Sequence, residues 1–196
     1  MDRIEDDVDR LLADNFGWPG NRDDYVGMIK WFKDEPQDYW LLTASYFVWD
    51  RGPLVFRWMI EQPKCDISVA AEIFWMADPA YSATHEIWTN PENEWEATAR
   101  LIARIVELER GRWFTRCGLG LARVTWDLEK HARELADRAA IECPLLPVPS
   151  GLINGFGSRQ MVFRDEKNPS KDPQADLVFS NLAGGSGMHR QQVGDN

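Results

Sequence analysis

Apolar residues recur every three or four positions through most of the first 140 residues, which is the period of an amphipathic α-helix. The pattern predicts about seven short helices, near residues 4–12, 22–33, 36–49, 54–62, 67–77, 91–109 and 124–138. Between the last two, residues 112–116 suit a short extended piece and residues 118–120 a flexible joint. The pattern therefore favours a chain built from helices.

Residues with strong positional preferences mark the ends of several of these helices. Asn21 and Asp66 precede apolar runs, where their side chains can cap the first turn. Pro36 suits the first turn of the third helix, and Pro79 ends the helix that Asp66 begins. Because the segment from Ile67 to Ala77 is apolar nearly all round, we expect it to be the central buried helix.

The amino-acid composition of the chain changes after residue 142. Residues 143–149 contain three prolines and cannot continue a helix, so we expect an extended Pro-rich segment that runs over the helical body. The residues that follow are poor in apolar groups and include a glycine-rich run at 184–187. The sequence thus predicts an all-α, compact multi-helix bundle in residues 1–158 and a flexible, disordered C-terminal tail in residues 159–196.

Composition narrows the class of protein. The 196 residues carry a net charge of −10, which argues against a nucleic-acid binder because such proteins need a basic surface. The acidic start lacks the features of a signal peptide, and no apolar run approaches the roughly 20 residues needed to cross a bilayer. Three widely spaced cysteines suggest neither a disulfide framework nor a zinc site. We expect a cytoplasmic protein with no membrane partner.

The acidic charge is unevenly distributed. Residues 1–38 hold 11 acidic and 5 basic side chains, a net charge of −6. Five of these acids gather around two predicted helix starts: Asp23, Asp24, Asp34, Glu35 and Asp38. Helix capping and solubility account for about half of them. The alternative is that they form a surface that attracts a basic protein.

Motifs for catalysis and for cofactor binding are missing from the chain. It has no phosphate-binding loop, no dinucleotide fingerprint, no Gly-x-Ser-x-Gly motif and no His-Glu-x-x-His motif. Of the three histidines, we expect His131 to be a core residue, and His85 is the best candidate for chemistry. Cys65, just before a helix cap, is the one candidate reactive thiol. We therefore predict no catalytic residues, no metal and no cofactor.

Three pieces of sequence resemble a known family. They are a helix ending in Trp49-Asp50-Arg51-Gly52, a loop reading Gln62-Pro63-Lys64-Cys65-Asp66, and a helix reading Ile73-Phe74-Trp75-Met76-Ala77-Asp78-Pro79. Together they make residues 35–82 similar to the uncharacterised bacterial family called domain of unknown function 4274. The resemblance implies a small helical domain of a kind often found near genes that resemble toxin–immunity loci. It supplies no active residues.

Two classes of function follow from these observations. The first is a protein-binding module, of the type of an immunity protein that neutralises a basic toxin through its acidic residues. The second is a small enzyme or ligand-binding domain with a pocket near five residues: Trp49, Asp50, Asp66, Asp78 and His85. A third possibility is a structural or regulatory protein whose tail carries the function. The oligomeric state is left open.

Overall fold

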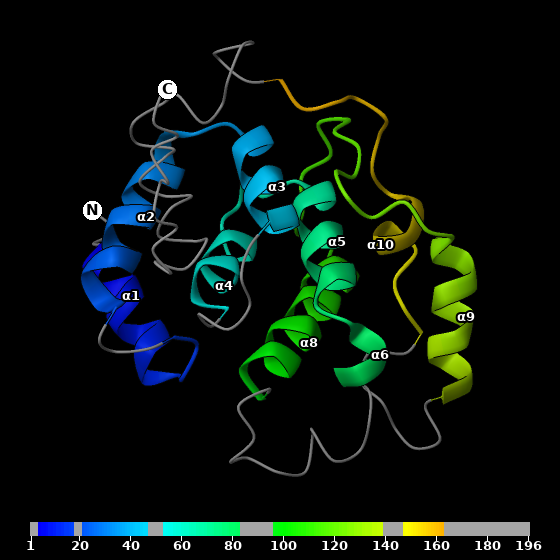
Figure 1. Cartoon of the computed structure of the whole chain (residues 1–196), viewed down its shortest axis with the longest axis horizontal. Coiled ribbons are helices and arrows are strands. Elements are labelled where there is room, and N and C mark those ends of the chain that lie inside the picture. The colour runs from blue at the N-terminus through cyan, green and yellow to red at the C-terminus, as the bar shows by residue number, and fades with distance from the viewer. Residues whose placement is uncertain (1–3, 18–20, 47–52, 83–95, 139–146, 163–196) are drawn as a thin grey trace, which may run out of the picture.

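The computed structural model describes residues 4–17, 21–46, 53–82, 96–138 and 147–162 (Figure 1). Within these residues the chain forms nine helices and no β-strand, which confirms the predicted all-α fold. The helices are α1 (Ile4–Ala13), α2 (Arg22–Asp34), α3 (Gln37–Tyr46), α4 (Leu54–Ile60), α5 (Ile67–Met76), α6 (Pro79–Ser82), α8 (Glu96–Arg110), α9 (Leu128–Arg138) and α10 (Gly151–Asn154). Two four-residue helices, α6 and α10, account for the excess over the predicted seven.

Helix α5 lies at the centre of the molecule, as its composition predicts. Every residue from Ile67 to Trp75 is buried. Helices α3, α4 and α8 pack against it, and α10 covers it on the side of α9 (Figure 1). The prediction of a central buried helix is confirmed.

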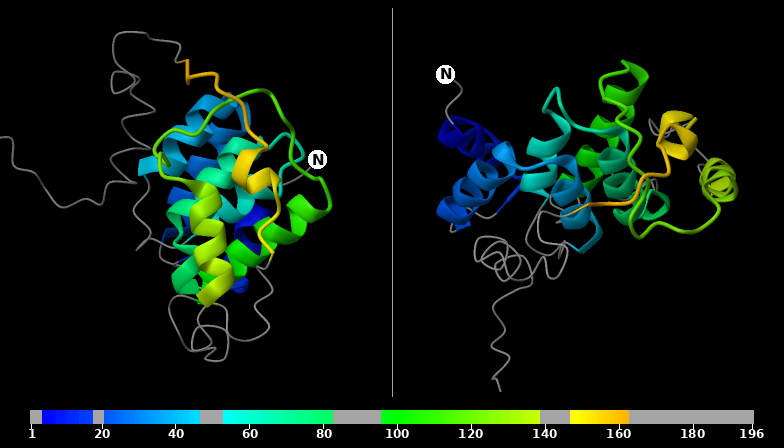
Figure 2. Two further views of the ribbon diagram at one scale, coloured as in Figure 1. Left: turned by 90° about the vertical axis from the view of Figure 1, so that its right-hand side faces the viewer. Right: turned by 90° about the horizontal axis from the view of Figure 1, so that it is seen from above.

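The first two helices pack against each other and, together with α4, form one end of the molecule, opposite α9 (Figure 2). In α2 the buried residues are Tyr25, Val26, Met28, Ile29 and Phe32, spaced at three or four positions as a helix packed on one face requires. The other residues of α2, including its acidic ones, lie on the side of the helix that faces solvent.

The two predicted helix caps have different outcomes. Asp66 is the N-cap of α5, and its carboxylate accepts a hydrogen bond from the Ser68 N–H at 2.9 Å. Asn21 makes no such bond, and its backbone angles of −105° and 18° lie outside the extended region that a capping residue adopts. Asn21 thus occupies the N-cap position of α2, as predicted, but its side chain does not make the capping bond.

Four acidic residues are buried in the described part of the chain: Asp38, Asp66, Glu72 and Glu109. A buried carboxylate is costly unless hydrogen bonds replace its water. All four accept hydrogen bonds from residues between 116 and 162. The carboxylates thus fasten the C-terminal segment to the helices formed by the first 110 residues, and we call them the four anchoring carboxylates.

Glu72 accepts four hydrogen bonds, three of them from the C-terminal segment. Its carboxylate accepts from the backbone N–H groups of Ala122, Arg123 and Val124 at 3.0, 2.8 and 3.3 Å, and from the Ser45 hydroxyl at 3.1 Å. Three consecutive amides are therefore fixed by one side chain of the central helix. The loop they belong to leads directly into α9.

The segments predicted as extended or flexible are tied down by two isolated β-bridges. One joins Asp66 to Thr115 and the other joins Leu119 to Arg159. Gly118 has a φ of 83°, a left-handed conformation that suits glycine. Asp38 also holds this region, because it pairs with the Arg159 guanidinium at 2.8 Å and accepts from the Val162 N–H at 2.7 Å. Residues 159–162, which the sequence assigned to the flexible tail, are thus anchored on the start of α3.

Parts of other predictions lie outside the described residues, namely residues 143–146 of the Pro-rich segment and residues 163–196 of the tail. None of the described helices has the length and apolar character needed to traverse a bilayer.

Candidate functional site

The acidic residues predicted to meet a partner lie mainly on α2. Asp23 and Asp34 are eleven positions apart, which is close to three full helical turns, so they share one face about 16 Å apart. Asp24 and Glu35 are also eleven positions apart, but Glu35 is the C-cap residue just after α2 and its backbone is extended. Asp23, Asp24 and Asp34 are exposed, whereas Glu35 is half-buried. We call these four residues the acidic row of α2.

Arg22 and Lys30 of α2 make their shorter ion pairs with α1, although Arg22 also lies 3.7 Å from Asp23 of the acidic row. Lys30 pairs with Glu5 at 2.8 Å, and Arg22 pairs with Asp9 at 2.6 Å. The Arg22 bond lowers the pKa of Asp9. Asp24 makes no salt bridge with another described residue, nor does Asp34. Burial lowers the pKa of Lys64, and the nearby charges of Asp34 and Glu35 oppose that shift. Lys64 therefore partly offsets one end of the row, whereas Asp24 faces solvent without a salt bridge to another described residue.

Asp38, the fifth residue of the predicted set, is separate from the acidic row. It is only 6% exposed, and Arg159 and the Val162 N–H occupy its carboxylate. Burial raises the pKa of Asp38, but the hydrogen bonds from Arg159 and Val162 outweigh burial and hold it below its usual value. The structure therefore corrects the sequence interpretation, because Asp38 is an internal anchor.

The pocket predicted from five residues is not assembled by those that the structure describes. Trp49, Asp50 and His85 lie outside the described residues. Asp66 and Asp78 flank α5 at its two ends, about 18 Å apart at the rise of an α-helix. Asp66 is fully buried and holds the Cys117 N–H, whereas Asp78 is exposed. These two carboxylates do not face one concavity.

Asp78 does line a pocket, but with other residues. A pocket of about 440 Å³ lies where the end of α5 and α6 meet α9. Its lining residues from the described chain are Trp75, Asp78, Pro79, Ala80, Trp126, His131, Glu134 and Leu135. We call this the α5–α9 pocket. The volume falls within the range of sites that bind small molecules or single side chains.

The two indoles of the α5–α9 pocket are held in different ways. Trp75 is 5% exposed, and its ring N–H donates to the Leu152 carbonyl of α10 at 2.7 Å. Trp126 is 38% exposed and lies 5.8 Å from the His131 ring, measured between centroids. The pocket thus has one fixed, nearly buried aromatic wall and one exposed aromatic wall.

His131 belongs to this pocket, although the sequence predicted a core position. Its Nδ1 lies 2.8 Å from the Asp127 carbonyl, which only accepts hydrogen bonds, so Nδ1 carries the proton. In the neutral ring, Nε2 is then an acceptor. The apolar stripe of α9 correctly placed Leu128 and Leu135 in the core, but His131 lies at the edge of that stripe.

Asp78 lies between two helices, after α5 and directly before α6. Its φ of 50° is left-handed, a conformation that asparagine and aspartate adopt more readily than other side chains. Its carboxylate accepts a hydrogen bond from the N–H of Tyr81, the third residue of α6, at 3.2 Å. Asp78 therefore caps α6 as well as lining the pocket.

The two cysteines in the described part of the chain, Cys65 and Cys117, offer no reactive site of the predicted kind. Cys65 is fully buried, and burial raises its pKa well above the usual value. Cys117 is exposed, but burial of its thiol and the nearby Asp66 raise its pKa as well. The prediction that Cys65 is the candidate reactive thiol was wrong, because the residue before the cap is enclosed by the core.

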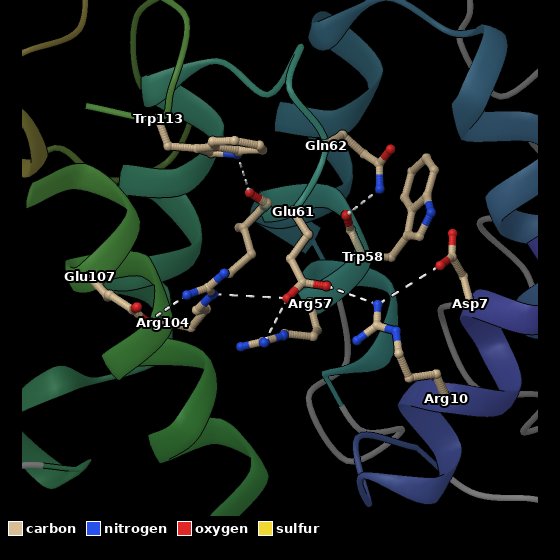
Figure 3. A network of polar contacts seen from close by, with 10 residues as sticks. Asp7, Arg10, Arg57, Trp58, Glu61, Gln62, Arg104, Glu107 and Trp113 are labelled. Carbon is tan, nitrogen blue, oxygen red and sulfur yellow. Dashed lines mark hydrogen bonds and ion pairs between the residues drawn. The ribbon is translucent and has the colours of Figure 1, made fainter. Parts of the chain in front are cut away.

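A network of arginines joins three helices on another part of the surface (Figure 3). The Glu61 carboxylate lies 3.0 Å from Arg10 of α1, 2.6 Å from Arg57 of α4 and 3.9 Å from Arg104 of α8. Asp7 lies 3.9 Å from Arg10, and Glu107 lies 2.6 Å from Arg104. Three acids thus balance three arginines, so the network joins helices without creating a basic surface.

The described helices define a small all-α protein in which a C-terminal segment is fastened around a central helix. Within it, residues 34–107 match the family described as Domain of unknown function (DUF4274). This match confirms the resemblance seen in residues 35–82 and extends it into α8. Comparisons with curated proteins and with solved structures return no match.

The matched region and the segment after it meet at the α5–α9 pocket. Trp75, Asp78, Pro79 and Ala80 come from the matched region, and the other four lining residues come from residues 126–135. Three of the four anchoring carboxylates also lie within the match. The pocket therefore depends on the anchoring of the C-terminal segment.

Proposed function

We propose that the protein is a binding module for a basic protein, of the type of an immunity protein that neutralises a toxin, and that the acidic row of α2 attracts this partner. The observation that carries the proposal is the exposure of Asp23, Asp24 and Asp34 on one helix without strong internal pairing. The resemblance to a family expected near toxin–immunity loci supports the same class of function.

The charge distribution supports a localised attraction. The described residues of 4–35 hold nine acidic and four basic side chains, a net charge of −5 within a total of −10. Since α2 is held by its apolar stripe and by ion pairs to α1, its charges have fixed positions. A fixed charged surface raises the rate of association with an oppositely charged partner by roughly 10- to 1,000-fold at low salt.

The test uses the purified product of the adjacent gene, in a form inactivated by mutation, as the candidate partner. Co-purification followed by stopped-flow or surface-based kinetics measures the association rate at about 50 mM and 500 mM salt. We expect the rate to fall at least about tenfold between the two, because salt screens exposed charges. Failure of the complex to form, or an association rate that does not change with salt, would contradict the proposal.

The alternative of an enzyme or ligand-binding domain retains one observation in its favour, which is the presence of Asp78 in the α5–α9 pocket. A search for turnover is best directed at His131, Asp78 and Glu134, because they are the titratable groups that line it. Loss of an activity on substitution of these residues would favour the alternative.

A further inference from the structure

We infer that the α5–α9 pocket binds a guanidinium group, and that the group is an arginine side chain of a protein partner. The argument for a guanidinium ligand comes from the residues that line the pocket. The source of the guanidinium rests on the proposed function, since a basic partner supplies exposed arginines. Helix α2, which carries the acidic row, and helix α9, which lines the pocket, lie on opposite sides of the molecule (Figure 1), so the two surfaces can be tested separately.

The charges of the lining residues select a cation. Asp78 and Glu134 contribute two carboxylates, and no lysine or arginine is among the described lining residues. Among the ion pairs of the described residues, one involves a lining carboxylate: the Lys130 amine lies 3.8 Å from Glu134, and the Lys130 side chain is 63% exposed. An exposed pair at this distance contributes little and is readily displaced. The carbonyl end of α5 adds negative potential beside Asp78.

The hydrogen-bonding groups select a ligand rich in donors. The two carboxylates accept hydrogen bonds, and the Nδ1–H of His131 is already used by the Asp127 carbonyl. The Trp75 N–H is already used by Leu152. A guanidinium brings five N–H donors in one plane and no acceptor. An ammonium brings three donors from a single point.

The aromatic walls favour the planar cation. Guanidinium groups stack on indole faces, whereas an ammonium is more strongly hydrated and loses more on leaving water. Trp126 is the exposed wall, so its ring is accessible to such a ligand. The combination of two indoles and two carboxylates therefore points to arginine rather than lysine.

The charge of Asp78 can be tested apart from its cap on α6. Its carboxylate accepts from the Tyr81 N–H at 3.2 Å, and the side-chain oxygen of asparagine can accept the same bond. Asparagine also tolerates the same φ and lacks the charge. Asp78→Asn should therefore leave the protein folded, with a free energy of unfolding close to that of the wild type, while weakening a bound cation. If the Asp78→Asn variant binds the cation more weakly but is as stable as the wild type, the role of the Asp78 charge is in binding rather than in folding.

The experiment titrates the full-length protein with N-acetyl-arginine amide and follows the ¹H–¹⁵N signal of the Trp126 indole, assigned with a Trp126→Phe variant. N-acetyl-lysine amide and N-acetyl-citrulline amide are the comparison ligands, since citrulline keeps the shape of arginine without its charge. We expect saturable shifts with arginine, at least fivefold weaker binding of lysine, and no saturable binding of citrulline.

Two variants locate the site. Asp78→Asn and Glu134→Gln should each weaken arginine binding about five- to tenfold, which is the effect of losing a charged partner at a partly exposed site. Glu129→Gln is the matched control, because Glu129 is exposed on the same helix and does not line this pocket. Equal losses in the control would show a general effect of charge and overturn the inference.

Three other outcomes would also overturn it: no shift of Trp126 with any ligand, equal binding of citrulline, or binding of lysine as tight as that of arginine. None of them bears on the salt dependence of partner association. Arginine binding without a basic protein partner would instead leave the guanidinium site in place and refute its assigned source.

Discussion

Replacing Glu72 with glutamine changes one atom of a fully buried side chain, and we expect it to destabilise the protein by about 2–4 kcal/mol. In the native protein one carboxylate oxygen accepts from Ser45, Arg123 and Val124, and the other accepts from the Ala122 N–H at 3.0 Å. The amide of glutamine retains only one acceptor oxygen. Its NH₂ group would face the Ala122 N–H, placing two donors together.

The magnitude follows from these bonds. An unsatisfied buried N–H costs about 1–3 kcal/mol, and the three bonds that remain lose the strength that a charged acceptor gives them. The assay is urea unfolding followed by circular dichroism, with the free energy of unfolding taken from the midpoint and slope. Glu129→Gln, at an exposed position, serves as the control and should stay within about 0.5 kcal/mol of the wild type.

Amide hydrogen exchange gives a second measurement. Ala122, Arg123 and Val124 should lose protection in the Glu72→Gln variant, because Glu72 is the acceptor for all three N–H groups. A variant as stable as the wild type, with unchanged protection at these three residues, would refute the idea that Glu72 fastens the C-terminal segment.

Three further predictions concern other positions. Gly27→Ala should raise the free energy of unfolding, measured by thermal melts, by about 0.5–1 kcal/mol, because alanine loses less backbone entropy than glycine when a helix forms. Gly27 is exposed within α2, and an added Cβ meets nothing within 4 Å. A lower melting temperature would contradict this prediction. Asp38→Asn should lower the free energy of unfolding at neutral pH, and its difference from the wild type should shrink as pH falls below about 4. The pKa of Asp38 is lower in the folded protein than in the unfolded chain, so the ionised carboxylate stabilises the fold above the unfolded pKa and this stability is lost as the carboxyl protonates. A free-energy difference that does not vary with pH in urea unfolding would contradict this prediction. In a Cys143→Ala variant treated mildly with iodoacetamide, mass spectrometry should find Cys117 modified and Cys65 intact. Cys65 should not react because it is fully buried and its pKa is raised. Modification of Cys65 in the folded protein would contradict the described packing.

The helices were predictable from the sequence because their signals are local. The apolar run from Ile67 to Ala77 lies in one window of sequence, and it identified the central helix correctly. Asp66 signalled its start by the same kind of local chemistry. Asn21 shows the limit of such reasoning, since its residue type suits a cap but its backbone does not adopt the required angles.

The anchoring carboxylates were not predictable in the same way. Asp38 looked like one member of an acidic cluster, and its partner Arg159 lies 121 positions away. Glu72 did carry a signal, because a single acid within an otherwise apolar helix must find hydrogen-bond partners when buried. The sequence does not say which loop supplies them.

The α5–α9 pocket combines predictable and unpredictable parts. Asp78 was a candidate from the sequence, and the structure places it in a pocket. Its neighbours Trp126 and Glu134 come from a segment about 50 residues later, brought there by the bonds to Glu72 and by the packing of α9. A pairing of that kind depends on tertiary contacts rather than on spacing along the chain.

The measurement that tests the proposed function most directly compares two variants of identical net charge. Asp24→Lys/Asp34→Lys reverses two positions in the acidic row of α2, and Glu129→Lys/Asp137→Lys reverses two exposed positions on α9, at the other end of the molecule (Figure 2). Because α9 also lines the pocket assigned to a partner arginine, the comparison uses the association rate alone. At low salt, we expect the first variant to associate with the basic partner about tenfold more slowly than the second. Equal association rates for the two variants would show that total charge, rather than the acidic row, governs binding, and would contradict the account.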